Sequence, residues 1–277
     1  LFLSTLHLSA QVRLSQKPAD GRKEPMALTV HYLARPPLAS PQNDVLNAMP
    51  VGLEAEIFNE FYVWMRNTKG IPVQVSWKGH VEFEAFYNAV KEADPFTLGF
   101  GNVTITEGRK KELDFSPPYL NNVSVLITNG KVPTVHDTAD IRKHLKGLQG
   151  VSTAGSVHAK YMDILRSSYL PNLKMEFVSD QNNIPRKVLR GDGYFGYVDI
   201  ITYWRYIKDA GSGYLKIHRF LNRGNEHLGF IMPKNAEILS YINEFFESGF
   251  GFTSTKRYHD ILEKYLGYEV ISTVAIR

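Results

Sequence analysis

Two polar side chains, Thr104 and Arg109, could hold a carboxylate together. Thr104 lies in an alternation of apolar and hydroxyl residues, Val-Thr-Ile-Thr, that is typical of the end of a strand. Arg109 follows five positions later, before a pair of prolines that stops any helix. A guanidinium matches a carboxylate with a planar fork of donors, and a hydroxyl adds another donor. An arginine alone is usually a solvated surface charge, so the interpretation depends on the order of the residues around it.

A second candidate anion site is the segment Ser152–Ser156. It lies between a predicted strand and a predicted helix. The backbone N–H groups of Ala154, Gly155 and Ser156 at a helix N-terminus would favour a negative charge. The alternative is an ordinary helix cap, because Ser and Thr are common at that position.

Asp199 is a candidate for binding a cationic group. It ends the apolar run Tyr194–Val198. Ligands of open α/β sheets bind at the carboxyl ends of the strands. The alternative is that Asp199 only caps the helix predicted over 202–209.

Alternating strand and helix patterns must position these side chains. The predicted strands are 27–33, 72–77, 96–100, 124–128, 148–153, 174–178, 194–198 and 228–232. The predicted helices are 51–65, 81–93, a short one within 135–146, 157–169, 183–190, 202–209, 237–247 and 253–265 with Gly267 as its C-cap. This alternation implies parallel sheets with helices on both faces. The length of 277 residues favours two lobes over a single core.

Composition excludes several classes of function. The net charge of +4 is small, and the basic residues are spread along the chain, which does not indicate nucleic-acid binding. The chain has no Cys, which excludes disulfides, thiolate catalysis and thiolate metal sites. The sequence contains no zinc-protease spacing of His, no nucleophile elbow and no P-loop. No apolar run is long enough for a complete transmembrane helix. We therefore expect no catalytic residue, cofactor or metal.

The run Asn102–Tyr119 resembles a family signature. The periplasmic-type solute-binding proteins for polar amino acids carry roughly G-I-T-I-T-x-x-R-x-x-x-x-D-F-S-x-P-Y, and this chain reads with Asn102 in the first position. The closing stretch 228–267 also resembles the end of these proteins, which pairs a strand carrying a Gly with a helix containing an Asn. The resemblance covers about 26–267 and is to the bacterial extracellular solute-binding proteins, family 3.

The resemblance implies an α/β, two-lobed type II periplasmic-binding fold. Each lobe would be a mainly parallel sheet flanked by helices, and two hinge crossings would join the lobes. Lobe 1 is expected at 26–122 and 226–277, and lobe 2 at 123–225. Residues 1–25 are expected to be a signal-peptide remnant or a flexible tether.

The resemblance also implies roles for the candidate residues. Thr104 and Arg109 would bind an α-carboxylate, and the segment 154–156 would face the same group from lobe 2. Asp199 would receive an α-ammonium. Asn102 replaces a small residue whose carbonyl faces that ammonium, so its amide would crowd the pocket or add a contact.

The aromatic wall of the family's pocket departs from the pattern. The family's Pro-Pro-Phe element reads Pro-Pro-Leu here, with Leu38 in place of the Phe. Leucine cannot stack on a flat or cationic group. Tyr32, Trp77 or Tyr119 could replace the aromatic ring; the alternative is that each belongs to the core.

The resemblance implies a non-catalytic binding protein, periplasmic or secreted. It would bind an amino acid or a related organic acid as a monomer and deliver it to a membrane permease complex, without a nucleic-acid partner. The alternatives are a sensing or regulatory module of the same fold and, more weakly, a small-molecule lyase or dehydratase.

Overall fold

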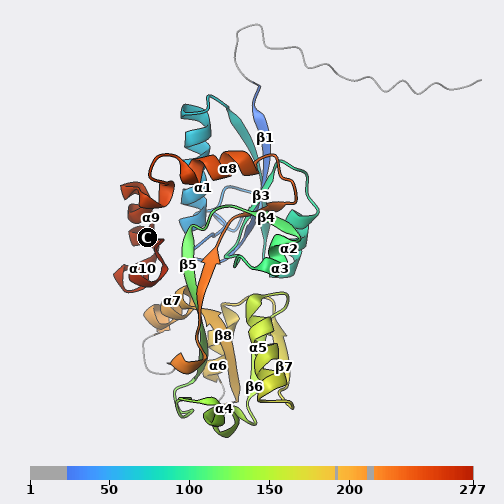
Figure 1. Ribbon diagram of the computed structural model, residues 1–277, viewed down its shortest axis with the longest axis vertical. Coiled ribbons are helices and arrows are strands. Elements are labelled where there is room, and N and C mark those ends of the chain that lie inside the picture. The colour runs from blue at the N-terminus through green and yellow to red at the C-terminus, as the bar shows by residue number, and fades with distance from the viewer. Residues whose placement is uncertain (1–23, 191–192, 211–214, 277) are drawn as a thin grey trace, which may run out of the picture.

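The computed structural model describes residues 24–276 except 191–192 and 211–214, so the expected leader lies almost entirely outside the described residues. The chain forms two sheets, each flanked by helices, in two lobes that follow one another along the long axis (Figure 1). We call the lobe around the first sheet lobe 1 and the lobe around the second sheet lobe 2. Within the described residues, no helix combines the length and the apolar character of a membrane span.

Lobe 1 is built on a five-stranded sheet of order β2-β1-β3-β11-β4. Strands β1, β2 and β3 are parallel, whereas β11 is antiparallel to both β3 and β4. The strands are β1 (Met26–Leu33), β2 (Val73–His80), β3 (Thr97–Phe100), β4 (Leu113–Phe115) and β11 (Ile231–Pro233). The helices are α1 (Leu53–Asn67), α2 (Phe83–Lys91), α3 (Glu107–Lys110), α8 (Leu239–Glu247), α9 (Lys256–Leu266) and α10 (Tyr268–Val274).

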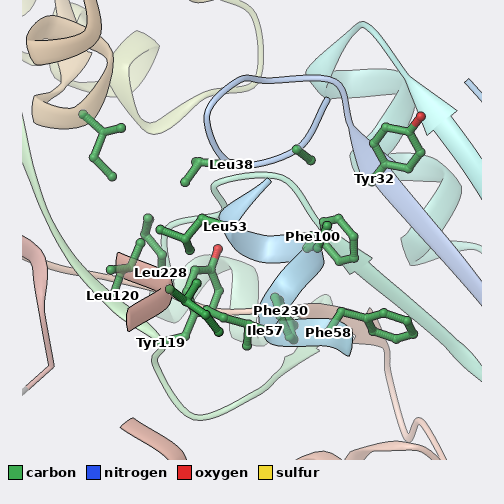
Figure 2. Packing of buried hydrophobic residues seen from close by; sticks show 14 of the residues in the cluster. Tyr32, Leu38, Leu53, Ile57, Phe58, Phe100, Tyr119, Leu120, Leu228 and Phe230 are labelled. Atoms are coloured by element: carbon green, nitrogen blue, oxygen red, sulfur yellow. The ribbon is translucent and has the colours of Figure 1, made fainter. Parts of the chain in front are cut away.

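Aromatic side chains fill the core of lobe 1. The buried face of α1 contributes Phe58, which lies against Phe100 of β3 (Figure 2). Phe230 packs between Phe100 and Tyr119, with ring centroids 5.7 and 4.9 Å away. Such pairs add about 0.5–1.5 kcal/mol beyond the burial of their area. The packing fixes the loops that follow β1 and β3, which carry the candidate site.

Lobe 2 is built on the order β10-β5-β8-β6-β7, with β9 paired to β5. Strands β6, β7 and β8 are parallel, and β5 is antiparallel to β8, β9 and β10. The strands are β5 (Leu120–Asn129), β6 (Gln149–Thr153), β7 (Met175–Val178), β8 (Tyr194–Asp199), β9 (Leu215–Ile217) and β10 (Arg223–Leu228). The helices are α4 (Thr138–Leu145), α5 (Val157–Ser168), α6 (Asn183–Arg190) and α7 (Ile200–Ala210).

Two antiparallel strands, β5 and β10, connect the lobes (Figure 1). Leu228 pairs with Leu120 at the lobe 1 end, and Arg223 pairs with Ser124 further into lobe 2. The C-terminal helices brace this crossing, because Tyr258 of α9 donates a 2.8 Å hydrogen bond to the carbonyl of Tyr119. The expected two crossings are therefore present, while the expected residue limits of the lobes stay a prediction.

Three local expectations from the sequence are wrong. The alternation at 103–106 forms no strand: Thr104 makes one isolated bridge to Leu228, and Thr106 instead caps α3. The single strand expected at 228–232 is split into β10 and β11, and Gly229 between them lies close to Ile105, where an added Cβ would be 3.0 Å away. A further helix, α10, follows Gly267, whose φ of 75° ends α9.

Candidate functional site

Arg109 lies on α3 at the junction of the lobes and is only 6% exposed. One terminal nitrogen donates to the carbonyl of Thr104 at 3.0 Å, and the other donates across the junction to the carbonyl of Gly155 at 3.3 Å. The guanidinium also lies 5.2 Å from the ring centroid of Phe83 and 5.6 Å from that of Tyr87. Burial lowers the pKa of Arg109, opposed by Tyr87 and by more distant acids, yet an arginine stays charged at neutral pH. These contacts hold a buried positive charge in place between the lobes.

The segment Ser152–Ser156 faces Arg109 from lobe 2. Ser156 caps α5: its hydroxyl accepts from the N–H of Ala159 at 3.1 Å and donates to the carbonyl of Thr153 at 2.7 Å. The helix cap that was the alternative interpretation is therefore formed. The Thr153 hydroxyl is buried and has no hydrogen-bond partner. Ala154, by contrast, is exposed to solvent.

Asp199 ends β8 and is 2% exposed. Its carboxylate accepts hydrogen bonds from three side-chain amides, those of Asn102, Asn122 and Gln181, and His158 Nε2 lies 3.5 Å from it. Burial alone would raise the pKa of Asp199, but the His158 imidazole, the Gln181 amide and the charge of Arg35 hold it well below its usual range. The carboxylate expected to bind an ammonium is thus already surrounded by donors of the protein itself.

Asn102 joins the two lobes at this point. Its side chain reaches Asp199 in lobe 2, and its backbone N–H donates to Glu54 Oε1 at 2.9 Å in lobe 1. Its φ of 57° places it in the left-handed region, which Asn tolerates better than most residues. Its amide contacts Asp199 and also borders the cavity, so whether it crowds a ligand or adds a contact to it stays a prediction.

Glu54 lies beneath the site and is fully buried. It accepts hydrogen bonds from the Asn102 N–H and from the Tyr119 hydroxyl, while its second oxygen has no partner. Burial raises the pKa of Glu54 to about 7, and the hydrogen bond from Tyr119 only partly opposes this shift. Nothing in the sequence singled out Glu54 beyond its place in the first turn of a helix.

Arg35, in the loop after β1, is the largest omission of the sequence-based prediction. It is 4% exposed, and one terminal nitrogen donates to Gln181 Oε1 across the lobes at 3.2 Å. Its Nε is buried and has no hydrogen-bond partner. Its position directly before two prolines, at the carboxyl end of the first strand, is the signal that could have indicated it.

A second polar cluster extends from the site into the crossing strands. Glu226 of β10 accepts from Asn122 at 2.8 Å, from Ser124 at 2.9 Å and from the Tyr161 hydroxyl at 2.6 Å. Burial raises the pKa of Glu226, and the Tyr161 hydrogen bond opposes this. Because Asn122 donates to both Glu226 and Asp199, the cluster couples the crossing strands to the site.

One small cavity lies where these residues meet. Its volume is about 10 Å³, which is about one water. Its walls are Arg35, Phe83, Asn102, Thr104, Arg109, Thr153, Ser156, Val157, His158, Gln181 and Asp199. Ligand pockets usually measure roughly 300–1,000 Å³, so a solute of several heavy atoms can enter only if the lobes separate or these side chains move. In the part of the chain that the structure describes, no group of three His, Asp or Glu side chains could hold a metal ion.

Two aromatic residues expected at the wall of the pocket, Tyr32 and Trp77, lie away from the cavity. Tyr32 is fully buried in the core of lobe 1 (Figure 2). Trp77 packs edge-on against Phe58, with ring centroids 5.3 Å apart. Neither borders the cavity, because both side chains lie in the core packed between the sheet and α1. Phe83, which the sequence placed only on the inner face of a helix, supplies the ring at the cavity instead.

A family model for bacterial extracellular solute-binding proteins, family 3, matches residues 29–268. The chain belongs to this family. The family groups solute-binding proteins rather than enzymes. No curated protein is similar enough in sequence to this chain to count as a match.

Solved structures with the same fold cover most of this family 3 chain. An ancestral arginine-binding protein bound to arginine is 21% identical, with a TM-score of 0.68, over 87% of this chain and 98% of its own. The arginine-, lysine-, histidine-binding protein ArtJ from Geobacillus stearothermophilus is 18% identical, with a TM-score of 0.66, over 89% and 99%. The GluR0 ligand-binding core from Nostoc punctiforme, in complex with L-glutamate, is 18% identical, with a TM-score of 0.62, over 88% and 100%. At these identities the comparison establishes the type II periplasmic-binding fold.

The predicted site residues thus divide into two groups. Thr104, Arg109, Asn102, Asp199 and Ser156 border one cavity, and Gly155 contacts Arg109 beside it. Their roles in binding stay predictions. Ala154, Tyr32 and Trp77 do not border the cavity.

Proposed function

We propose that this family 3 protein binds a small solute with a carboxylate group, an amino acid or a related organic acid, in the cleft between its lobes. It then delivers the solute to a membrane transporter from the periplasm or the cell exterior. The protein acts as a monomer and without a cofactor.

One observation carries the proposal: a buried arginine with only neutral partners spans the junction of the lobes. Arg109 contacts the carbonyls of Thr104 in lobe 1 and Gly155 in lobe 2. Its guanidinium stands beside the N-terminus of α5, where backbone N–H groups favour an anion. A carboxylate at this place would pair with Arg109 and contact both lobes at once. A ligand that contacts both lobes favours the closed arrangement over the open one.

The two crossing strands support closure as the mode of binding. Strands β5 and β10 are the connection between the sheets, and rotation about a few residues of such strands closes a cleft. A transporter can then distinguish the loaded protein by the relative position of its lobes. The proposed solute site and the proposed delivery therefore use the same motion.

The experiment that tests the site is titration calorimetry of the wild-type chain and of Arg109→Ala against a panel of amino acids and small organic acids. Loss of a buried charge-assisted pair costs about 2–5 kcal/mol, so the affinity should fall roughly 30- to 5,000-fold. Arg66→Ala, at an exposed arginine of α1, serves as the matched control and should bind as the wild type does. Equal affinities of the wild type and Arg109→Ala would contradict the assignment.

Genes beside the gene of this protein test delivery. A permease and an ATPase encoded there would support transport. A kinase or cyclase in their place would contradict transport and support a sensing module.

A further inference from the structure

We propose that the solute carries two acidic groups, one bound at Arg109 and the second at Arg35. The ligand class is a small dicarboxylate, either an acidic amino acid or a diacid without an ammonium group. This inference rests on the proposed function, because it assigns the first carboxylate to Arg109.

The first support is that two buried guanidiniums border the same cavity. Arg35 and Arg109 come from different segments of lobe 1 and are 4% and 6% exposed. Within the described residues, neither forms an ion pair with a carboxylate. Their hydrogen-bond acceptors are the backbone carbonyls of Thr104 and Gly155 and the side-chain carbonyl of Gln181. Buried charges with only neutral partners are costly, and an anion at each would offset that cost.

The second support is the unused donor of Arg35. Its Nε is buried without a partner, while a terminal nitrogen of the same guanidinium contacts Gln181. An incoming carboxylate can accept from Nε and from a terminal nitrogen together, the paired geometry in which Arg binds carboxylates best. Gln181 accepts from the other terminal nitrogen, Nη1, so this pairing does not require its displacement, and the amide nitrogen of Gln181 would stay on Asp199.

The third support is that no free carboxylate awaits a cationic ligand side chain. Asp199 is the one acidic residue among the cavity walls, against two arginines. Three amides and the imidazole of His158 already surround it. The other acids near Arg35, Asp180 and Glu54, act on it over a longer range and do not border the cavity. A lysine or arginine ligand would bring its positive side chain toward Arg35, which disfavours it.

The test is titration calorimetry of the full chain with five compounds: L-glutamate, L-glutamine, glutarate, L-lysine and L-arginine. Glutamate and glutamine have nearly the same shape, but the distal group of glutamate is a charged acceptor and that of glutamine is a neutral amide. We expect glutamate to bind about 10- to 100-fold more tightly than glutamine, the range of a hydrogen bond to a charged group. We expect L-lysine and L-arginine to bind more weakly than either. This comparison needs no variant, so it does not depend on the folding of a mutant.

The variant Arg35→Gln then tests whether Arg35 is the residue that causes the preference for glutamate over glutamine. It removes the charge and keeps a shorter, neutral hydrogen-bond donor, and it should bring glutamate and glutamine to equal affinity by weakening the binding of glutamate. Arg35→Lys keeps the positive charge but lacks the planar pair of N–H donors, so it should retain part of the preference for glutamate. A preference for glutamate that persists in Arg35→Gln would overturn the assignment.

The remaining outcomes separate this inference from the proposed function. If glutamine or lysine binds as tightly as glutamate, and Arg109→Ala abolishes the binding, the dicarboxylate inference is wrong and the proposed function stands. If no carboxylate binds, both are wrong. The ratio of glutamate to glutarate distinguishes the two kinds of diacid: equal affinity indicates that the ammonium contributes nothing, and tighter glutamate indicates that it joins Asp199.

Discussion

Two buried carboxylates lie on either side of the same asparagine and differ in charge state. Asn102 donates its backbone N–H to Glu54 in lobe 1 and its side-chain amide to Asp199 in lobe 2. Both acids are at most 2% exposed. Nevertheless, the pKa of Glu54 is raised to about 7, while that of Asp199 lies well below its usual range.

The difference comes from the donors around each acid. Burial raises the pKa of both, because a charged carboxylate loses its hydration. The His158 imidazole, the Gln181 amide and the charge of the nearby Arg35 reverse that effect at Asp199. At Glu54 the Asn102 N–H and the Tyr119 hydroxyl donate to one oxygen, the other oxygen has no hydrogen-bond partner, and these bonds only partly oppose the effect of burial. Lobe 2 therefore contributes a fixed negative charge to the cleft, and lobe 1 contributes an acid that titrates near neutral pH.

The largest expected effect is that of Asp199→Asn. The new amide would place its N–H group against donors such as Asn122 and Gln181, so the free energy of unfolding should fall by about 3–5 kcal/mol, the range for breaking a buried charged pair. Urea unfolding at pH 7 measures this difference. A depressed pKa stabilises the fold above the unfolded value of 3.8, so the gap to wild type should shrink as the pH falls below that value.

Asp163→Asn is the matched control for this change. Asp163 is exposed on α5, where its side chain contacts Arg166. We expect the control to unfold as the wild type does, both at pH 7 and below pH 3.8. An Asp199→Asn variant as stable as the control would show that the donors around Asp199 do not need its charge.

The next effect concerns the pH dependence of stability through Glu54. A raised pKa stabilises the fold below the unfolded value of 4.5, and this contribution is lost as the pH rises through about 7. The shift corresponds to about 3 kcal/mol between those limits. In Glu54→Gln the side chain is neutral at every pH, so this part of the decline should disappear. Urea unfolding from pH 4.5 to 8 measures it, with Glu263→Gln, at an exposed position of α9, as the control. An unchanged slope in Glu54→Gln would show that Glu54 is not the group that titrates.

The same pair of acids shows which parts of the site the sequence could predict. Asp199 was predicted because the carboxyl end of an apolar strand is a local pattern. The donors that fix its charge state come from positions far along the chain: Asn102 is 97 residues away and Asn122 is 77. Which side chains meet there depends on how the lobes are placed, and a local pattern does not contain that information.

Arg35 and Tyr32 show the same limit in opposite directions. Arg35 was not predicted, because its hydrogen-bond partner Gln181 is 146 residues away in lobe 2. Tyr32 was a candidate for the pocket wall, with the core as the alternative, and its side chain lies in the core. Strand residues alternate between two faces, and which face a helix covers is decided by packing rather than by the strand itself.

The elements of the fold were predicted better than their pairing. Strands β1, β2 and β3 and helices α1 and α2 lie where the apolar periodicity placed them, because that signal is local. The antiparallel partners β5, β10 and β11 were not anticipated, since strand direction in a sheet depends on distant segments.

The smallest expected effect is that of two substitutions at Asn102. Together they separate the contribution of its side-chain contact from that of its backbone conformation. Asn102→Gly and Asn102→Ala both remove the amide that reaches Asp199, and both keep the N–H that reaches Glu54. At a φ of 57° only alanine adds strain, so Asn102→Ala should be about 1 kcal/mol less stable than Asn102→Gly in urea unfolding at pH 7. The glycine variant itself should lose about 1 kcal/mol relative to wild type, the usual net worth of one hydrogen bond. If the glycine variant instead equals the wild type, Asn122, Gln181 and His158 are sufficient to hold the charge of Asp199. The contact between the lobes at Asn102 would then add nothing to stability, and its contribution would have to be sought in the closing of the cleft around a ligand.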